Sequence, residues 1–579
     1  MNRSLRNLAV GAAALATALI TPAGCTEDPL TLPEQYNTGR WRQLTFDFTT
    51  KKTGDTQYVV PLNGMNGSPK PIIPGDSDLT TNMWGRTSTS PEGPDGAHVR
   101  IVRVGTDTLC QLSLEGIFPD NSRDPDDPNS YDFSTLDSHI KAIEELNTAR
   151  VMWQAAFKPG GNCDAEVGAQ IGAPIGSQAE ADLYAKVAFN TLRHLRSPGT
   201  SGETWDPLYK NFRVSVFEFA DDPIGQMGYP TSSSDPAWTL LFDTYAKVAN
   251  DIKTEWPDQQ DDNDPNSNVP RVYVGGLSFS FGSPSELDFT GGAANKPALF
   301  AFVDYCKNND VPLDFISFKT KTATPQESFQ IAEKIKDYLV SADMSHVKLT
   351  LTDFEPDYSS SEYANAQVLD DPLFMSAHLG AFQTAVRVLG QDIPLTWALA
   401  GRAPRVYSDL QPHIGESPSS LEKLIVPSAY FDEDGLAKPA YMALFPFRQV
   451  PGHQRFGVNV AESDLDDGFV LMGSHPTSSD DTIHIIIANA NIGKGDASVT
   501  YDLRVKTWVL PQVQSVKYRL ATLDRNAQGS SSFYFSETGT IETTDNAGWV
   551  RFVHDMAIPS VHYLTFQIGK VCAVGENCN

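Results

Sequence analysis

Between about residues 56 and 449, short apolar runs alternate with amphipathic helical patterns, and this alternation limits the possible folds more than any other feature. The runs lack polar–apolar alternation, which is typical of strands buried on both faces. They are VRIVRVG (99–105), RVMWQAAF (150–157), FRVSVFEF (212–219), RVYVGGL (271–277), LDFISF (313–318), VKLTLTDF (347–354) and IPLTWALA (393–400). No Gly-rich phosphate loop follows the first strand, so roughly eight such units favour a barrel over an open sheet. The predicted fold class is α/β, a (β/α)8 TIM barrel over residues 56–450.

Helix starts can be recognised between several of these runs. Ser134 precedes a segment whose leucines and isoleucines fall on one face. Ser177 and Glu180 have the spacing of a capping box, and Asp235 with Pro236 opens another helix. These signals place the predicted helices between the predicted strands, as a barrel requires.

After about residue 455 the pattern changes to strict alternation. In SVTYDLRV, Val499 and Leu503 share one side while Asp502 and Arg504 lie on the other, and no helical pattern intervenes between such segments. We expect residues 451–579 to form a C-terminal antiparallel β-sandwich. The early segment WRQLTFDFT (41–49) also alternates, so residues 25–55 are expected to be a tether with a possible strand of that sandwich.

The N-terminal segment has the features of an export signal. Residues 1–24 combine a basic start, an apolar stretch and a small-residue exit before Cys25. That position resembles the lipid-attachment site of bacterial lipoproteins, although Pro22 departs from the usual aliphatic residue; the alternative is ordinary cleavage with Cys25 left unmodified. We therefore expect an exported protein of the bacterial cell envelope, held to the membrane only by a lipid anchor, or secreted.

The remaining cysteines fit an oxidising compartment. Cys572 and Cys578 bracket a short terminal loop, which favours a disulfide. Cys110 and Cys163 follow two strands expected to be neighbours, which makes a second disulfide possible. Cys306 lies inside a helical pattern and is expected to be a small buried hydrophobe.

The net charge of −28 is distributed over the loops, which disfavours nucleic acid as a partner. The loop DDNDPN lacks the spacing and closing Glu of an EF-hand, and no Cys/His spacing suggests zinc. We predict neither a metal nor another cofactor.

Two of the predicted strands end in acidic residues. VFEFADDP (216–223) and LTLTDFEPD (349–357) both place carboxyl groups at the end of the barrel that carries active sites. Two converging carboxyl groups are the minimum apparatus for hydrolysing a glycosidic bond, and one of them is expected to have a raised pKa. Pro223 selects Asp222 over Asp221, although Asp-Pro is also a common turn opener.

On the second of these strands Asp353 is favoured over Glu355, because Pro356 suggests that the strand ends before Glu355.

In order along the chain, several stretches resemble glycoside hydrolase family 39, the β-xylosidase and α-L-iduronidase group of the retaining barrel glycosidases. They are the acids after the fourth and seventh strands, FKP (157–159), VGG (274–276), VPLDFISF (311–318) and DGLAKPAYMAL (434–444). The resemblance covers most of residues 56–450. It implies an oligo- or polysaccharide substrate, with Asp222 as acid/base and Asp353 as nucleophile.

The departures from that family lie in the expected cleft. Asp222 and Asp353 stand where the family has Glu, and Asp221 replaces an Asn that binds the sugar. Lys319 and Lys321 occupy positions of a His and a Tyr. They either bind an acidic sugar or neutralise nearby aspartates.

Other inward candidates follow from the same resemblance. Either Arg100 or Arg103 corresponds to an arginine kept inside the barrel, and Glu218 is expected to be a buried structural partner. Trp153 and Trp397 are candidates for stacking on a sugar ring, with core packing as the alternative.

Two functions remain from the sequence. The first is an exported glycoside hydrolase that uses Asp222 and Asp353. The second is a catalytically inactive carbohydrate-binding or surface lipoprotein that retains the scaffold.

Overall fold

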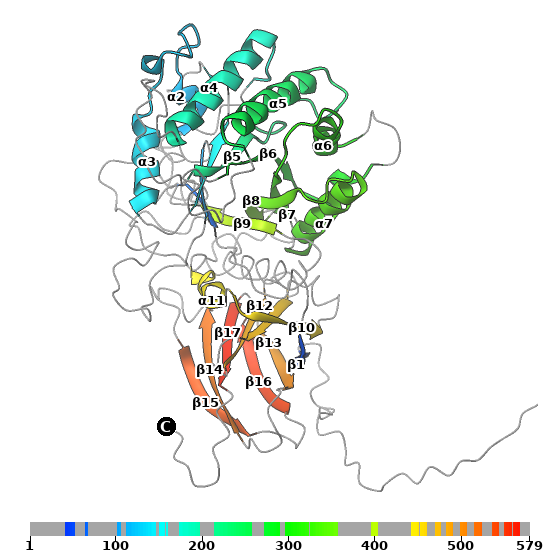
Figure 1. Ribbon diagram of the computed structural model, residues 1–579. Helices are drawn as coiled ribbons and strands as arrows, with labels where there is room; N and C mark the ends of the chain where they lie inside the picture. The colour runs from blue at the N-terminus through cyan, green and yellow to red at the C-terminus, as the bar shows by residue number, and fades with distance from the viewer. Residues whose placement is uncertain are drawn as a thin grey trace, which may run out of the picture.

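The computed structural model contains a barrel and a sandwich (Figure 1). It describes residues 41–51, 64–67, 101–105, 112–145, 150–156, 158–159, 173–196, 214–257, 271–289, 296–322, 325–356, 395–402, 442–450, 452–459, 469–475, 482–489, 498–506, 515–523, 535–542, 549–557 and 560–567. The segment 1–24, Cys25, Arg100 and the cysteines at 110, 163, 572 and 578 lie outside the described residues. No helix among the described residues has the length and apolarity to cross a membrane.

Eight parallel strands close into a barrel. They are β2 (Gly64–Asn66), β3 (Ile101–Val104), β4 (Arg150–Ala155), β5 (Val214–Asp221), β6 (Tyr273–Phe281), β7 (Phe315–Thr322), β8 (Lys348–Pro356) and β9 (Leu395–Arg402). The pairing of β2 with both β3 and β9 closes the ring. The TIM-barrel prediction is confirmed, and the seven predicted strands correspond to β3 to β9. The sequence GMN of β2 has no apolar run, so its strand carries no local signal.

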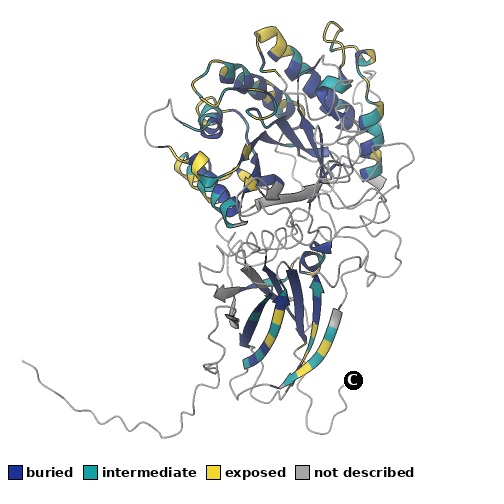
Figure 2. Cartoon of the chain, turned by 180° about the vertical axis from the view of Figure 1, so that it is seen from behind, coloured by how far each residue is buried: buried dark blue, intermediate teal, exposed yellow. Residues whose placement is uncertain are grey.

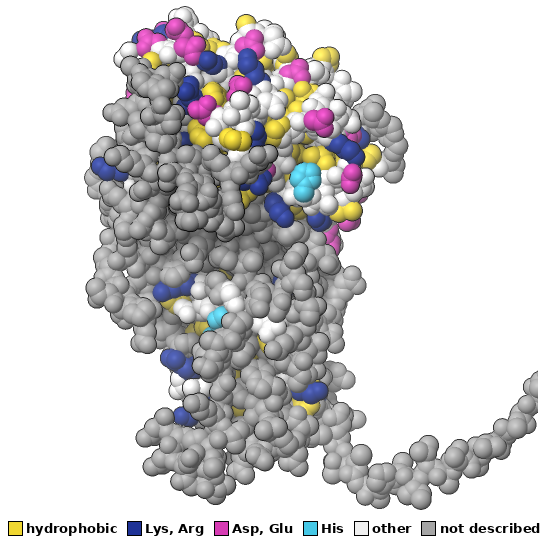
Figure 3. Space-filling view, in the orientation of Figure 1, with side chains coloured by type: hydrophobic (Ala, Val, Ile, Leu, Met, Phe, Trp, Pro, Cys, Tyr) yellow, Lys and Arg dark blue, Asp and Glu magenta, His cyan; other side chains and the backbone are white. Residues whose placement is uncertain are grey.

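Helices cover the outside of the barrel, where Figure 2 shows their inner sides buried and their outer sides exposed. They are α2 (Leu114–Ile117), α3 (Ser134–Glu145), α4 (Gln178–Arg196), α5 (Ala237–Glu255), α6 (Ala298–Asn308) and α7 (Pro325–Ser341), with short 3-10 helices η3 (Pro128–Ser130) and η4 (Pro284–Leu287). Figure 3 shows acidic and basic side chains interspersed over this surface. Cys306, on α6, is buried as predicted, and burial raises the pKa of its thiol.

The first turns of these helices follow the capping signals in part. Ser177 Oγ accepts from the Glu180 amide at 3.3 Å, but Glu180 Oε2 accepts from Gly176 N at 3.1 Å, one residue before the predicted partner. Asp235 Oδ1 accepts from the Ala237 amide at 2.9 Å. Side chains therefore satisfy amides that the first turn of each helix leaves without an intrahelical partner.

Inside the barrel the lining changes from apolar to polar along the strands. Ile101, Met152, Val216 and Phe315 form a small buried cluster of their own. The buried polar residues Arg103, Gln154 and Glu218 lie two positions after Ile101, Met152 and Val216 on the same strands. Since side chains two apart share a face of a strand, the barrel interior is apolar near the strand starts and polar toward their carboxyl ends.

The sandwich is built from one long, mostly antiparallel sheet. Its strands are β1 (Trp41–Lys51), β10 (Gln454–Asn459), β11 (Phe469–His475), β12 (Thr482–Asn489), β13 (Ser498–Lys506), β14 (Ser515–Leu523), β15 (Phe535–Glu542), β16 (Trp549–Ala557) and β17 (Ser560–Gln567). Their order is β15-β14-β17-β12-β11-β10-β1-β13-β16. As the alternation at 41–49 suggests, β1 is a strand of this sheet, parallel to β13 and antiparallel to β10.

Alternating side chains form the sandwich core. Tyr501 and Leu503 of β13 belong to its buried cluster, together with side chains of β12, β14, β16 and β17. Asp502, on the opposite face, is also buried. Its carboxylate forms ion pairs with Arg504 Nη2 at 3.1 Å and with Arg551 Nε at 2.8 Å. The polar side of this strand is therefore not a simple solvated face.

A shared apolar cluster joins the two parts. Phe447 of the short helix α11 (Phe445–Arg448) and the preceding Leu444 belong to the main barrel cluster. The same cluster contains Ile486, Val561 and Tyr563 from the sandwich. Figure 1 shows α11 between the barrel and the sandwich. The sandwich thus packs against the barrel through α11.

Candidate active site

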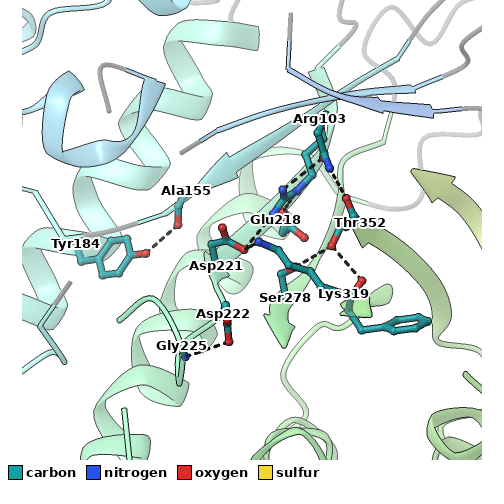
Figure 4. Close-up of polar contacts among 12 residues, drawn as sticks. Arg103, Ala155, Tyr184, Glu218, Asp221, Asp222, Gly225, Ser278, Lys319 and Thr352 are labelled. Carbon is teal, nitrogen blue, oxygen red and sulfur yellow. Dashed lines mark hydrogen bonds and ion pairs between the residues drawn. The ribbon is translucent and has the colours of Figure 1, made fainter. Parts of the chain in front are cut away.

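Positive φ angles break the regular alternation at the end of β5, the fourth strand of the barrel. Ala220 has φ 60° and Asp222 has φ 36°, both in a region that non-glycine residues rarely adopt. The Asp222 amide donates to the Ser278 carbonyl at 3.0 Å. As a result Asp221, three positions after Glu218, points into the buried network, and Asp222 lies beyond it at the rim (Figure 4).

Asp221 is fully buried, and its carboxylate is paired with two cations. Its Oδ1 lies 2.6 Å from Lys319 Nζ and 3.2 Å from Arg103 Nη2, and its side chain is 0% exposed. An enclosed carboxylate that is already paired has no surface for a substrate. The expectation that Asp221 binds the sugar directly is therefore wrong, because its ionic partners occupy it.

Arg103 is buried inside the barrel, and Arg100, the alternative, lies outside the described residues. Its Nε donates to Glu218 Oε2 at 2.6 Å, and its Nη1 donates to Asn66 Oδ1 at 3.4 Å. The contact with Glu218 spans β4, which lies between the two strands. Burial is the largest cause of a raised pKa at Glu218, and Arg103 opposes it. Glu218 is thus the buried structural partner that the sequence predicts.

Hydroxyl and amide groups complete the interior wall. Asn66 Nδ2 donates to the Thr352 carbonyl at 2.7 Å. The hydroxyls of Ser278 and Thr352 are 2.7 Å apart, and Thr352 Oγ1 donates to the Phe318 carbonyl at 3.1 Å. Sequence reasoning missed Asn66, Ser278 and Thr352, because single polar residues within strands give no signal without the barrel that joins them.

Asp222 is half-buried at the rim. Its Oδ1 accepts from the Gly225 amide at 3.1 Å. A Cβ on Gly225 would lie 2.3 Å from Asp222 Oδ2, so the glycine leaves room for the carboxyl group. Burial raises the pKa of Asp222, while the charge of Lys319 and the Gly225 hydrogen bond oppose the increase. A carboxyl group with a raised pKa at a rim is suited to holding a proton.

Asp353 lies on β8, the seventh strand of the barrel. It is 4% exposed and is the register partner of Lys319 on the adjacent β7. The strand continues through Glu355, which pairs with Lys321, to Pro356. The expectation that the strand ends before Glu355 is wrong, because the adjacent β7 extends to Thr322, which pairs with Pro356. The side chain of Glu355 lies outside the described residues.

The two lysines of β7 differ in their surroundings. Lys319 is 7% exposed and pairs with Asp221, which is the neutralising alternative left open by the sequence. Lys321 is exposed at the end of the same strand. Lys321, rather than Lys319, is therefore the lysine whose ammonium group can contact a ligand from solution.

Trp153 is not a wall of the cleft. It is 0% exposed and belongs to the cluster between the barrel and its helices, with its ring 5.6 Å from that of Phe217. The expectation that it stacks on a sugar is wrong, because its place in the strand directs it toward the helices. Trp397 is on β9 opposite Thr350, and its side chain lies outside the described residues. Among the described residues, no group of three or more His, Cys, Asp or Glu could hold a metal ion.

Comparisons with known proteins bear on the fold. No family model matches the sequence, and no curated protein matches it. Among solved structures, the chain is similar to a glucosidase from Croceicoccus marinus, with 18% identity and a TM-score of 0.58 over 91% of this chain and 99% of that chain. The chain is also similar to the GH39 enzyme from Xanthomonas axonopodis pv. citri, with 13% identity and a TM-score of 0.54 over 91% of this chain and 97% of that chain.

A third similar structure is a monomeric β-xylosidase from Caulobacter crescentus CB15, with 12% identity and a TM-score of 0.54 over 91% of this chain and 99% of that chain. The chain therefore has a glycosidase-like fold, which extends over barrel and sandwich together.

Proposed function

We propose that this protein is a glycoside hydrolase that cleaves O-glycosidic bonds of a glycan, with Asp222 as general acid/base and Asp353 as the second carboxylate. One observation carries the proposal: the half-buried Asp222, with its raised pKa, directly follows the fourth strand of a glycosidase-like barrel, and Asp353 lies in the carboxyl-terminal half of the seventh. Active sites of such barrels lie at these strand ends.

The chemistry assigned to the two groups follows from their surroundings. A carboxyl group that keeps its proton to a higher pH can protonate the departing glycosidic oxygen, as Asp222 is placed to do. Asp353 would be the second carboxyl group, which attacks the sugar or stabilises its cation in a two-carboxylate mechanism. Aspartate is shorter than glutamate by one methylene, and the φ values at Ala220 and Asp222 alter where the shorter acid is presented.

Kinetics on aryl glycosides with good and poor leaving groups test both roles. We expect Asp222→Ala to lose about 100-fold to 10,000-fold on poor leaving groups and much less on dinitrophenyl glycosides, which depart without a proton. Asp353→Ala should lose activity with every leaving group, and Glu355→Ala should lose less than Asp353→Ala. Asp120→Ala, an exposed acid on the barrel surface, is the control. Full activity of the Asp222 and Asp353 variants would contradict the proposal.

A second candidate is a carbohydrate-binding protein without turnover. It is favoured by the hydrogen bond from Gly225 to Asp222, which holds the carboxyl group toward its own turn. Calorimetry with oligosaccharides separates the two functions. Saturable binding that persists in Asp222→Ala, with no product from the wild type after long incubation, would support this second candidate.

Within the hydrolase function we propose an acidic glycan as the substrate class. The residue that supports this proposal is Lys321. This lysine is exposed at the strand end beyond the paired Lys319. Lys321→Gln should raise KM for uronate-bearing glycosides and leave KM for neutral ones unchanged. Equal KM values for both substrates in the wild type would remove the idea.

Export and a lipid anchor complete the proposal. They rest on residues 1–24 and Cys25, whose sequence has the order of an export signal followed by a cysteine. Mass spectrometry of the mature N-terminus, for the wild type and Cys25→Ser, distinguishes a lipid-anchored from a secreted protein.

A further inference from the structure

We propose that Lys319 is a positioning residue of this site: its ammonium group, held by the buried Asp221, acts on the adjacent Asp222 and sets how readily that acid releases its proton. The inference rests on the proposed function and concerns the same site. It assigns a role to a lysine that touches neither a leaving group nor the sugar in the proposed reaction.

The path of the Lys319 side chain is the first support. Its backbone pairs with Asp353 on β8, while its Nζ reaches Asp221 Oδ1 on β5 at 2.6 Å (Figure 4). The side chain therefore extends from beside one candidate carboxylate to the immediate neighbour of the other. Asp221, which Arg103 also contacts, fixes the far end.

Charge balance is the second support. Among the described residues of the interior, Arg103 and Lys319 are the cations, and the buried acids are Glu218, Asp221 and Asp353, with Asp222 at the rim. Arg103 is engaged by Glu218 and Asp221. Burial raises the pKa of both Glu218 and Asp222, and Lys319 is the cation whose charge opposes the increase at Asp222.

Three other polar side chains on the elements around this site are uncharged or exposed to solvent. On β6, Ser278 offers only a hydroxyl group, and on α4 the phenol of Tyr184 near Asp221 donates to the Ala155 carbonyl at 2.8 Å. Lys321, further out on β7, is exposed to solvent. The charge of Lys319 therefore limits how far burial raises the pKa of Asp222.

The pH profile of kcat/KM tests this role, with Lys319→Gln as the principal variant because glutamine can still donate a hydrogen bond to Asp221. We expect the basic limb, which reports Asp222 as the general acid, to move to higher pH by about one pH unit, since an ammonium group no longer favours the ionised carboxylate. Lys319→Arg should restore the wild-type profile. Lys247→Met, which removes an exposed pair of 2.9 Å with Asp182 on the outer helices, is the matched control.

A lower rate with an unmoved profile would assign Lys319 a structural role only and overturn the inference. The same follows if Lys319→Arg moves the profile as far as Lys319→Gln.

A titration without substrate separates failure of this inference from failure of the proposed function. The carboxyl carbons of labelled aspartates, assigned with Asp222→Asn and Asp353→Asn, are followed by NMR against pH. In Lys319→Gln the Asp222 midpoint should rise by about one pH unit, and in Lys319→Arg it should stay at the wild-type value. An unmoved midpoint in Lys319→Gln, or a raised one in Lys319→Arg, overturns the inference. An inactive wild type refutes the hydrolase alone, and the Asp222 midpoint in Lys319→Gln still decides the role of Lys319.

Discussion

The barrel and the sandwich both bury ionisable groups, but they do so in opposite ways. Among the described buried residues of the barrel interior, acids outnumber the cations Arg103 and Lys319, and burial raises the pKa of Glu218 and Asp222. In the sandwich, Asp502 is matched by two arginines, and burial lowers the pKa of His562 to about 3, which keeps that ring neutral. A surplus of buried acid is costly for stability, which fits the active site proposed there, whereas the sandwich pairs its buried acid Asp502 with two arginines, as a structural part would.

The largest expected difference concerns the two enclosed aspartates. Asp221→Ala leaves Lys319 without that carboxylate and should lower the free energy of unfolding by about 3–5 kcal/mol. Asp502→Ala should cost less, about 1–3 kcal/mol, because Arg551 is 27% exposed and can be hydrated. Urea unfolding of both variants measures the losses. An equal or larger loss for Asp502→Ala would break the comparison.

The next effect separates activity from stability at the barrel mouth. In Gly225→Ala the new Cβ displaces the Asp222 carboxyl group, whose Oδ2 would otherwise be 2.3 Å away. A displacement of this size should lower kcat/KM on the order of 100-fold, while the free energy of unfolding changes by about 1 kcal/mol. Gly176→Ala is the control, since its Cβ would meet only ordinary contacts of 3.9 Å with Glu180. Unchanged activity of Gly225→Ala would contradict the position assigned to Asp222.

The sandwich should lose stability in acid. His562 is 1% exposed, and its Nδ1 is 3.2 Å from the Tyr501 hydroxyl. Its pKa is near 6.5 when unfolded and about 3 when folded, so the unfolded chain binds the proton first as the pH falls below 6.5. From pH 7 to pH 5 the sandwich should lose about 2 kcal/mol.

Urea unfolding at both pH values checks this, with His562→Gln expected to remove most of the pH dependence. His346→Gln, at an exposed position of the barrel, should behave as the wild type. A sandwich equally stable at both values would show that His562 is not kept neutral by burial.

The smallest effect has the opposite sign and belongs to the barrel. Because burial raises the pKa of Asp222, the unfolded chain ionises first as the pH rises. The stability that the protonated Asp222 contributes is complete below its unfolded pKa and is lost as the pH rises through the folded one. Asp222→Asn should therefore be more stable than the wild type at pH 7 and equally stable near pH 3. A variant less stable than the wild type at pH 7 would show that the ionised Asp222 is the favoured form.

Local patterns in the sequence were sufficient for the architecture. Seven continuous apolar runs indicate strands buried on both faces, and period-two alternation after residue 455 indicates an antiparallel sheet. Both signals are local, because each strand must match its own two faces. The same reasoning placed Asp222 directly after its strand, whereas the strand of Asp353 continues three residues further, to Pro356.

Only the tertiary structure decided which acid is buried and which lies at the rim. The φ of Ala220 shifts the alternation so that Asp221 meets Arg103 and Lys319, and no propensity in the sequence encodes that strained residue. Trp153 faces the helices, Asn66 belongs to a strand of three residues, and β8 continues through Pro356, each for reasons that lie in neighbouring strands. The sequence by itself determined the order of strands and helices, because that depends on local periodicity. The partners of each charge depend on strand register and barrel closure, which bring together residues more than a hundred positions apart, such as Arg103 and Glu218.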